Sequence, residues 1–276
     1  MFRIFSGALS IDRHTIPVVD LPTRLQGITI AQLSDFHFDG LRLSDALLAR
    51  TIDKLQECNP DFIALTGDFV TDDPAPIYEL VRRIKNLPSR YGTFAVLGNH
   101  DIQRSGAKDV VTKALEQADI PVLWNAIAYP FGPDFPVVGF ADLWSGKFDP
   151  TILNQLDPSV PRLVLSHNPD TAEQLAVYRV DLQLSGHTHG GQIYLPGIGS
   201  GPEFWKKIRR WVPRFIRNRI PGLSDRCFQV VKHWEWGRGL HRVEGNWLYV
   251  NRGLGTYPPG RLFCPPELTL LTLVKA

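Results

Sequence analysis

Between residues 27 and 185 the chain alternates short apolar runs with longer amphipathic stretches. Short apolar runs bounded by turn residues predict buried strands, and the amphipathic stretches between them predict helices. The expected strands cover residues 28–33, 62–65, 94–97, 137–140, 163–165 and 182–184. Strands and helices that follow one another in this way indicate an α/β fold.

The clearest of the expected helices covers residues 43–55. Its apolar residues recur close to the helical period, at Leu43, Ala46, Leu47, Ile52 and Leu55. The other expected helices cover residues 76–86, 105–118 and 170–177. After residue 190 come loops rich in Gly, Pro and Trp, followed by alternating stretches at 229–231, 246–250 and 268–274. We expect these stretches to be antiparallel strands that complete a second sheet, with the helices outside.

The composition is that of an ordinary globular protein. The 276 residues are 43% hydrophobic and 21% charged, and the chain is long enough to bury a large core. Because the polar motifs described below span most of the chain, we expect one domain over residues 1–276. The cysteines Cys58, Cys227 and Cys264 are far apart, so they suggest no disulfide framework and indicate a reducing compartment.

The sequence contains no stretch typical of export or membrane insertion. Residues 1–17 lack the apolar run of an export signal. No segment approaches the roughly 18 uninterrupted apolar residues of a spanning helix. We therefore expect a cytoplasmic protein, or one that lies on the inner face of the membrane without crossing it.

Five polar blocks each follow an expected strand. They are Asp35-Phe36-His37, Gly67-Asp68, Gly98-Asn99-His100-Asp101, Ser166-His167 and Gly186-His187-Thr188-His189. Because strand ends face the same edge of a sheet, the five blocks can converge in space despite their separation in sequence. Each block alone has an ordinary explanation, such as a turn, a helix cap or a buried histidine.

Taken together, the blocks predict a metal site. They hold five of the eight histidines in the chain. Asp35 and His37 are separated by one residue, as are His187 and His189, so each pair can point toward one ion. Mixed carboxylate and imidazole ligands suit Mn, Fe or Zn, whereas an all-oxygen set would suit Ca or Mg.

The ordered set of blocks resembles the calcineurin-like metallophosphoesterases over residues 27–273, which is nearly all of the chain. The extended forms at residues 186–192 and 249–255 resemble a bacterial subgroup of membrane-associated or exported phosphodiesterases. The resemblance implies a four-layer α/β/β/α sandwich of two mixed sheets. It also implies a dinuclear metal site at the C-terminal ends of the strands.

The resemblance further implies which residues hold the two divalent ions. One ion would be bound by Asp35, His37 and His189, the other by Asn99, His167 and His187, with Asp68 bridging both. Two cations held roughly 3.5–4 Å apart can polarise a phosphoryl group and supply hydroxide. No ligand position of the family pattern is missing from the sequence.

His100 and Asp101 are the expected catalytic residues. By resemblance His100 faces the substrate, where it would protonate the leaving oxygen or stabilise charge on the phosphoryl oxygens. Asp101 would orient His100, and a helix N-cap is its alternative role. Hydrolysis would proceed by attack of metal-bound hydroxide on phosphorus, without a covalent phosphoenzyme.

A basic, aromatic insertion that forms a wall, cap or membrane-contact element is expected at about residues 197–240. Its segment 205–219 reads WKKIRRWVPRFIRNR, with seven Lys or Arg and no acid. On a helical wheel its aromatic and basic residues fall on opposite sides, which suits a lipid headgroup layer. A helix packed on the core is the other leading interpretation, and nucleic-acid binding is the least favoured.

The expected activity is hydrolysis of a phosphodiester or pyrophosphate in a phosphorylated small molecule or lipid. A lipid-facing wall would suit a phospholipid or a lipid-linked nucleotide such as UDP-2,3-diacylglucosamine. The alternatives are a soluble nuclease, a cyclic-nucleotide phosphodiesterase, or a non-catalytic scaffold of the same fold. Candidate substrate-binding residues are Arg252, Arg261 and Asp142, with surface or turn roles as their alternatives.

Overall fold

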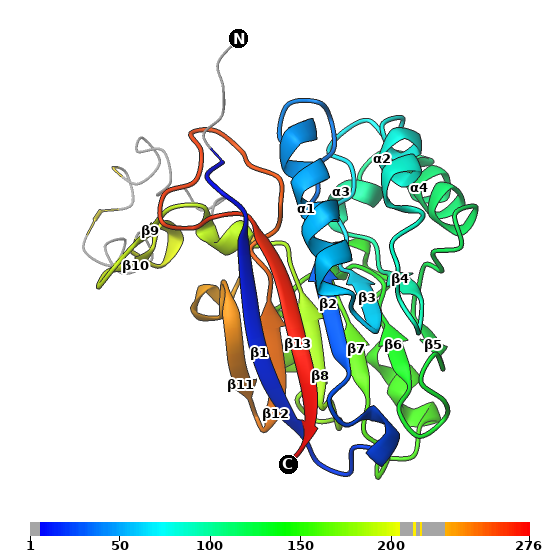
Figure 1. Cartoon of the computed structure of the whole chain (residues 1–276). Coiled ribbons are helices and arrows are strands. Elements are labelled where there is room, and N and C mark those ends of the chain that lie inside the picture. Colours follow the sequence, from blue (N-terminus) through cyan, green and yellow to red (C-terminus); the bar gives the residue numbers. More distant parts are fainter. Residues whose placement is uncertain (1–5, 205–211, 214–215, 217–229) are drawn as a thin grey trace.

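Two β-sheets packed face to face form the centre of the protein (Figure 1). The coordinates are a computed structural model that describes residues 6–204, 212–213, 216 and 230–276. The first sheet contains, in spatial order, β1 (Ser10–Val18), β13 (Glu267–Lys275), β2 (Thr29–Leu33), β3 (Phe62–Leu65) and β4 (Thr93–Ala95). Strands β2, β3 and β4 are parallel, whereas β13 runs antiparallel to β2 and parallel to β1.

The second sheet is also mixed. Its spatial order is β11 (Gly239–Val243), β12 (Asn246–Val250), β8 (Leu182–Ser185), β7 (Leu163–Leu165), β6 (Val137–Gly139) and β5 (Ala126–Ala128). The four inner strands are parallel, and the two edge strands run antiparallel to their neighbours. A separate short hairpin consists of β9 (Tyr194–Leu195) and β10 (Gly199–Ser200).

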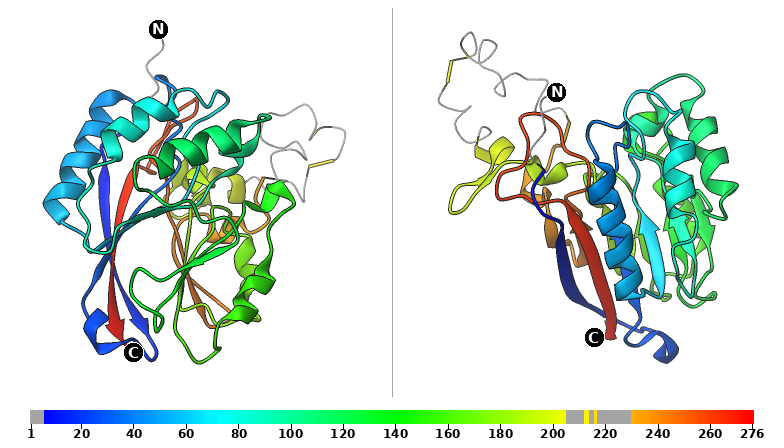
Figure 2. Two further views of the ribbon diagram at one scale, coloured as in Figure 1. Left: turned by 90° about the vertical axis from the view of Figure 1, so that its right-hand side faces the viewer. Right: turned by 45° about the horizontal axis from the view of Figure 1, so that its top comes forward.

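Helices cover the outer face of each sheet, as Figure 2 shows from two directions. The first sheet is covered by α1 (Asp45–Cys58), α2 (Ile77–Ile84) and α4 (Ala107–Glu116). The second is covered by α5 (Thr171–Leu175) and the 3-10 helix η3 (Pro150–Gln155). Within the described residues, the remaining short helices are η1 (Thr23–Leu25), α3 (Asn99–Ile102), η2 (Leu143–Ser145), η4 (His189–Gly191) and η6 (Trp234–Trp236).

Apolar side chains fill the space between the sheets. Ile30, Phe62 and Leu271 from the first sheet meet Leu165 and Leu184 from the second, and all five are fully buried. Burial of apolar surface is the main force that holds such layers together. The predicted four-layer α/β/β/α sandwich is therefore confirmed.

The edge where the parallel strands begin is joined by ion pairs that cross between the sheets. Arg179, which precedes β8, contacts the Asp20 carboxylate at 3.3 Å and donates to the carbonyl of Val19 at 2.7 Å. Arg24 in η1 pairs with Asp134, which precedes β6. The opposite edge, where these strands end, carries the polar blocks.

The six strands expected before residue 185 and the four expected helices are present, with shifts of a few residues at their ends. Two expectations after residue 190 were wrong. Residues 230 and 231 are not in a strand, while residue 229 lies outside the described part. The stretch 268–274 does form a strand, β13, but it lies in the first sheet instead of the second.

Most of the basic segment 205–219 lies outside the described residues, so its expected role stays a prediction. Among the residues that the structure does describe, no helix is long and apolar enough to cross a membrane.

Candidate metal centre

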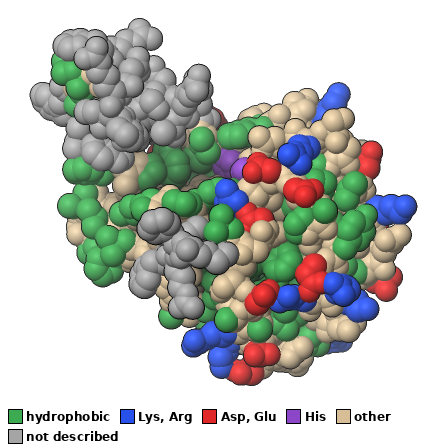
Figure 3. Space-filling view, turned by 90° about the horizontal axis from the view of Figure 1, so that it is seen from above, with side chains coloured by type: hydrophobic (Ala, Val, Ile, Leu, Met, Phe, Trp, Pro, Cys, Tyr) green, Lys and Arg blue, Asp and Glu red, His purple; other side chains and the backbone are tan. Residues whose placement is uncertain are grey.

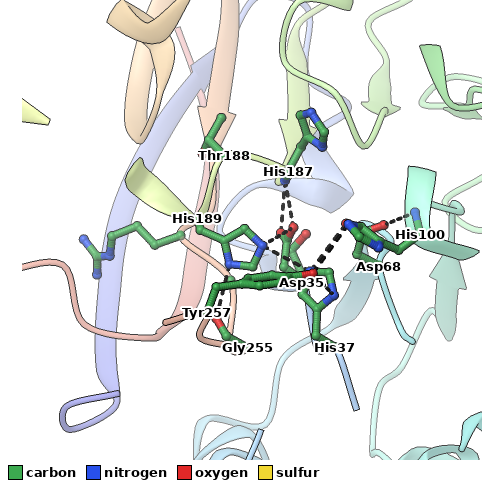
Figure 4. Close-up of polar contacts among 12 residues, drawn as sticks. Asp35, His37, Asp68, His100, His187, Thr188, His189, Gly255 and Tyr257 are labelled. Atoms are coloured by element: carbon green, nitrogen blue, oxygen red, sulfur yellow. Dashed lines mark hydrogen bonds and ion pairs between the residues drawn. The ribbon is translucent and has the colours of Figure 1, made fainter. Parts of the chain in front are cut away.

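The loops at the ends of five parallel strands bring the predicted ligands together. Figure 4 labels five of them, Asp35, His37, Asp68, His187 and His189. The first sheet supplies four residues after β2, β3 and β4, and the second supplies three after β7 and β8. In chain order they are Asp35, His37, Asp68, Asn99, His167, His187 and His189, and all are buried. The centre thus lies at the junction of the two sheets.

Five of these residues have a left-handed backbone. Their φ angles lie between 46° and 70°, at Asp35, His37, Asp68, His187 and His189. For residues other than glycine this conformation is uncommon, and sparsely populated conformations cost roughly 1–3 kcal/mol each where the surroundings impose them. Such clustering is typical of a functional site.

Two glycines let the loops approach one another closely. A Cβ atom on Gly98 would lie 2.1 Å from the Asp68 Oδ1 atom, and one on Gly186 would lie 2.3 Å from the Asp35 Oδ2 atom. Both distances are far below van der Waals contact. Any larger residue would push a predicted ligand carboxylate out of place.

The ligating atoms face one another across short distances. The Nε2 atoms of His37 and His189 are 3.1 Å apart, and His189 Nε2 lies 3.5 Å from Asp35 Oδ1. Asp68 Oδ2 lies 3.5 Å from His37 Nε2 and 3.2 Å from His167 Nε2. His187 Nδ1 is 3.2 Å from His167 Nε2. Asp68 therefore occupies the position between two groups of ligands that a bridging carboxylate requires.

Hydrogen bonds on the far side of the rings fix the tautomers of three of the histidines. The rings of His167, His189 and His187 contact the carbonyl oxygens of Thr66 at 2.6 Å, Gly255 at 3.2 Å and Val230 at 3.1 Å. A carbonyl can only accept, so each of these nitrogens carries the proton and the other nitrogen offers a lone pair toward the centre. This is how metal-binding histidines are usually held.

The charge state of these rings also fits metal binding. Burial lowers the pKa of His187 to about 4 and that of His189 to about 3, and burial lowers the pKa of His37 as well. Neutral imidazole is the form that binds a metal ion. His167 differs, because burial, which lowers its pKa, is outweighed by the carboxylates of Asp68, Asp35 and Asp142, so that the pKa is raised. A cation beside Asp68 would take the place of that proton.

Asn99 supplies a further indication of a bound ion. Its Oδ1 atom is buried and has no hydrogen-bond partner in the described part of the chain. An unpaired buried oxygen is costly unless a ligand completes it. Together with the carboxylates and the free imidazole nitrogens, this oxygen fits a pair of divalent ions.

His100 lies at the rim of the centre and is half-buried. Its Nδ1 atom lies 3.2 Å from the carbonyl oxygen of Thr71, so Nδ1 carries the proton in the neutral ring. Its Nε2 atom is 3.5 Å from the hydroxyl oxygen of Tyr257, and both residues line the same cavity. The ring is thus held where Nε2 can exchange a proton with a substrate.

Asp101 is not placed to orient His100. Its carboxylate accepts hydrogen bonds from the backbone N–H groups of Gly98 at 2.9 Å, Asp68 at 2.8 Å, Phe69 at 2.8 Å and Val70 at 3.2 Å. Burial, with a smaller effect from Asp68, raises its pKa, and the bonds from Gly98 and Val70 oppose that rise. Asp101 therefore caps α3 and fixes the Asp68 loop, which agrees with the alternative helix-capping role.

The other expected substrate-binding residues do not line the cavity at the metal centre. Arg252 pairs with Asp12 at 3.0 Å and with Glu267 at 2.9 Å. Arg261 is buried and donates to backbone carbonyls, including that of Gly255 at 2.7 Å. Since Gly255 also accepts from His189, Arg261 supports a predicted metal ligand from behind.

Asp142 is buried in a turn after β6. Its Oδ1 atom accepts from the N–H of Trp144 at 2.9 Å, which caps η2, and burial raises its pKa to about 6. This placement agrees with the turn role that was its alternative.

A cavity of about 1060 Å³ opens over the centre. Polar residues, among them Asp68, His100, His187 and His189, make up part of its lining. The apolar part of the lining, the apolar wall, consists of Ile102, Trp144, Pro202, Val230 and Trp234. Figure 3 looks onto this face and shows histidine side chains between hydrophobic groups on one side and charged groups on the other.

Tyr257 and Trp144 are cavity residues that the sequence analysis missed. The Tyr257 hydroxyl lies 3.1 Å from His37 Nδ1, and the guanidinium of Arg42 covers its ring at 4.5 Å. Trp144 meets the His187 ring edge-on at a centroid distance of 5.2 Å, and 49% of its surface is exposed. Tyr257 follows the block at 249–255 by two residues, and that position was the only signal for it.

Comparison with known proteins agrees with this geometry. The sequence profile of the calcineurin-like phosphoesterases matches residues 28–191. A UDP-2,3-diacylglucosamine pyrophosphatase, LpxG of Chlamydia trachomatis, is 30% identical over 90% of this chain and 84% of its own length. The phosphodiesterase YaeI of Escherichia coli is 31% identical over 88% of this chain and 80% of its own. The metallophosphoesterase YkuE of Bacillus subtilis is 30% identical over 94% and 84%.

Proposed function

The chain belongs to the calcineurin-like phosphoesterase family, and from this we propose that it hydrolyses a phosphodiester or pyrophosphate whose substrate carries a large apolar group. The observation that supports the proposal is the cavity, whose lining combines predicted metal ligands with the apolar wall. The phosphate group would lie on the polar side, and the apolar group would contact Trp144, Trp234 and Ile102.

Two divalent ions would be held by Asp35, His37, Asp68, Asn99, His167, His187 and His189. Ions of this kind polarise a phosphoryl group and make hydroxide available near neutral pH. The mixed carboxylate and imidazole set favours Mn, Fe or Zn. The chain itself positions the carboxylates through the Gly98 and Gly186 turns, and burial keeps the imidazoles of His37, His187 and His189 neutral.

His100 has the geometry of a proton donor to the leaving oxygen. Its Nδ1 atom is fixed by Thr71, so only Nε2 faces the cavity. A protonated Nε2 would stabilise the charge that develops as the bond to phosphorus breaks. Apolar side chains such as Ile102 would exclude water beside it, which would strengthen this interaction.

A lipid-linked substrate such as UDP-2,3-diacylglucosamine, or a phospholipid, fits the apolar wall. The Chlamydia relative is named a UDP-2,3-diacylglucosamine pyrophosphatase, which supports a substrate of this class. We further propose that the protein contacts a membrane peripherally from the cytoplasmic side. The exposed apolar residues Leu195, Ile198, Leu262 and Phe263 lie on the β9–β10 hairpin and the loop that pairs with it, and the basic segment 205–219 follows closely in sequence.

Hydrolysis of bis-p-nitrophenyl phosphate with added Mn²⁺ tests the hydrolase itself. Asp68→Ala is expected to abolish both activity and metal binding, because it removes the bridging carboxylate. His100→Ala is expected to keep both ions, measured by elemental analysis, while turnover falls by roughly 10²–10⁴-fold. Unchanged turnover in Asp68→Ala would overturn the proposal.

The lipid part requires a separate comparison. UDP-2,3-diacylglucosamine in detergent micelles or vesicles is expected to be hydrolysed with a higher kcat/KM than its deacylated analogue. Trp144→Ala should reduce that preference, since it removes part of the apolar wall. Equal rates for both compounds would instead favour a soluble nuclease or cyclic-nucleotide phosphodiesterase.

A further inference from the structure

A second hollow, of about 700 Å³, adjoins the metal-centre cavity. Ile102, Gln103 and Ser145 line both spaces. The second hollow lies along the loop between α3 and α4, which begins three residues after His100. A substrate bound at the metal centre can therefore extend past His100 into it.

The lining of this hollow is rich in positive charge. Arg104, Lys108 and Lys147 line it, against a single carboxylate, that of Asp149. Within the described residues, none of the three cations takes part in an ion pair. The Asp149 carboxylate already accepts two hydrogen bonds from Thr151, at 3.0 Å from N–H and 2.6 Å from the hydroxyl. An excess of positive charge is left for a ligand.

Two of these cations, Lys147 and Lys108, are held in place by contacts with neighbouring residues. The side chain of Asn125 donates to the carbonyl of Lys147 at 2.7 Å and accepts from the N–H of Ala141 at 3.0 Å, which anchors the Lys147 loop. The Lys108 ammonium lies 4.1 Å from the centre of the Trp124 ring. Contacts of this kind hold a cation in place without neutralising it.

We propose that this hollow binds a second anionic group of the substrate, a phosphate or diphosphate located beyond the scissile bond. The inference rests on the proposed function, because it assigns the charge of the substrate that the metal centre cleaves. The enzyme then binds its substrate at two places. The scissile phosphate lies at the metal centre, and another phosphate lies at Arg104, Lys108 and Lys147. A substrate with a neutral group on this side gains nothing from these cations.

The interaction is electrostatic and partly exposed to solvent, so salt should weaken it. Arg104 and Lys147 are exposed and Lys108 is half-buried. The triple variant Arg104→Gln/Lys108→Gln/Lys147→Gln removes the three charges with little change in size. The matched control is the triple variant Lys85→Gln/Arg90→Gln/Lys113→Gln. It also removes three positive charges, all of them exposed, and none of these residues lines the hollow.

The first experiment compares two substrates that differ by one phosphate, thymidine 5′-(p-nitrophenyl phosphate) and the same ester with a 3′-phosphate. Total hydrolysis is measured by chromatography, so cleavage on either side counts. In the wild type and in the control variant, kcat/KM should be higher for the ester with the 3′-phosphate. In the triple variant the ratio of the two kcat/KM values should fall at least tenfold. An unchanged ratio would overturn the inference.

The second experiment does not depend on catalysis. Metal-free protein is titrated with inorganic pyrophosphate by calorimetry at low and at physiological salt. Binding should weaken at least tenfold in the triple variant, remain within twofold in the control variant, and weaken with salt in the wild type. Equal binding by all three proteins would overturn the inference. If the wild type failed to hydrolyse either ester, the proposed hydrolase function would fail, and this titration would still decide whether the hollow binds phosphate.

Discussion

At the scale of single residues, the centre depends on backbone conformations that side chains rarely adopt. Asp35, His37 and Asp68 sit at positive φ at the ends of strands β2 and β3. With the backbone in this form, their side chains lie close to one another. The cost is offset by buried hydrogen bonds, such as those from the His187 N–H to Asp35 at 3.0 and 3.1 Å.

Asp101 illustrates a residue whose effect is on structure. Replacing it with Ala leaves four buried N–H groups without a partner, so we expect the free energy of unfolding to fall by about 3 kcal/mol or more. Urea unfolding of the metal-free protein measures this. Asp53→Ala, on the exposed side of α1, should change it by no more than about 0.5 kcal/mol. Normal stability with slowed turnover at full metal content would instead support the role of orienting His100.

Tyr257 should act through His37. Tyr257→Phe removes the hydroxyl that contacts His37 Nδ1 but keeps the ring beneath Arg42. Loss of such an outer partner typically costs roughly 10–100-fold in metal affinity or activity. We expect a loss of that size in Mn²⁺ affinity, measured by calorimetry. Tyr129→Phe, at a side chain that is 52% exposed, is the control, and equal affinities in both variants would contradict the role.

At the scale of elements, the recurring unit is a short buried strand followed by a turn that carries polar residues. These units were predictable, because each combines an apolar run with a conspicuous block such as Gly186-His187-Thr188-His189. Six of the seven predicted ligands lie in groups whose ligand atoms are within 4.8 Å of one another, and Asn99 lines the cavity with Asp68 and His187. The strands and the convergence of these side chains were therefore visible in the sequence, while their binding of metal stays a prediction.

Elements held by long-range pairing were harder to predict. Strand β1 contains Asp12, Arg13 and His14, lies mostly half-buried at a sheet edge, and shows no apolar run. The sheet to which β13 belongs could not be read from its sequence, since that depends on a crossover back to β2. The position of Arg252 away from the cavity has the same origin, because its partners Asp12 and Glu267 lie on β1 and β13.

The Gly186 turn tests the requirement for close approach. Gly186→Ala places a methyl group against Asp35 and Ser34, at distances of 2.3 Å and 1.9 Å from their oxygens. We expect metal content after purification to fall to below half of the wild-type value, as measured by elemental analysis. Gly201→Ala is the matched control, since its added Cβ would meet nothing closer than 3.6 Å. Full metal content in Gly186→Ala would show that the turn can relax.

At the scale of the whole molecule, the ions would join the two sheets. Asp35, His37, Asp68 and Asn99 follow strands of the first sheet, and the three other histidines follow strands of the second. Ions bound only by the folded chain stabilise it in proportion to their affinity and concentration. The metal centre would thus be part of the tertiary structure as well as the site of chemistry.

Metal removal should therefore destabilise the protein. At a free metal concentration of 100 Kd each site contributes about 2.7 kcal/mol, so chelation should lower the midpoint of thermal unfolding by roughly 10 °C or more. Differential scanning calorimetry with and without chelator measures the shift. The midpoint of the Asp68→Ala variant should change little when chelator is added. An unfolding midpoint of the wild type that is the same with and without chelator would contradict a metal centre that links the sheets.

The two sheets would be held together by different interactions at their two edges, by metal ions at one edge and by ion pairs at the other. Arg179–Asp20 and Arg24–Asp134 join the sheets where the strands begin, and exposed pairs of this kind weaken as ionic strength rises. Chelator acts on one end of the interface and salt on the other. Each treatment should therefore destabilise one end of the interface without the other. In hydrogen exchange, the first amide hydrogens to exchange should lie at the metal-centre end in chelator and at the ion-pair end in high salt.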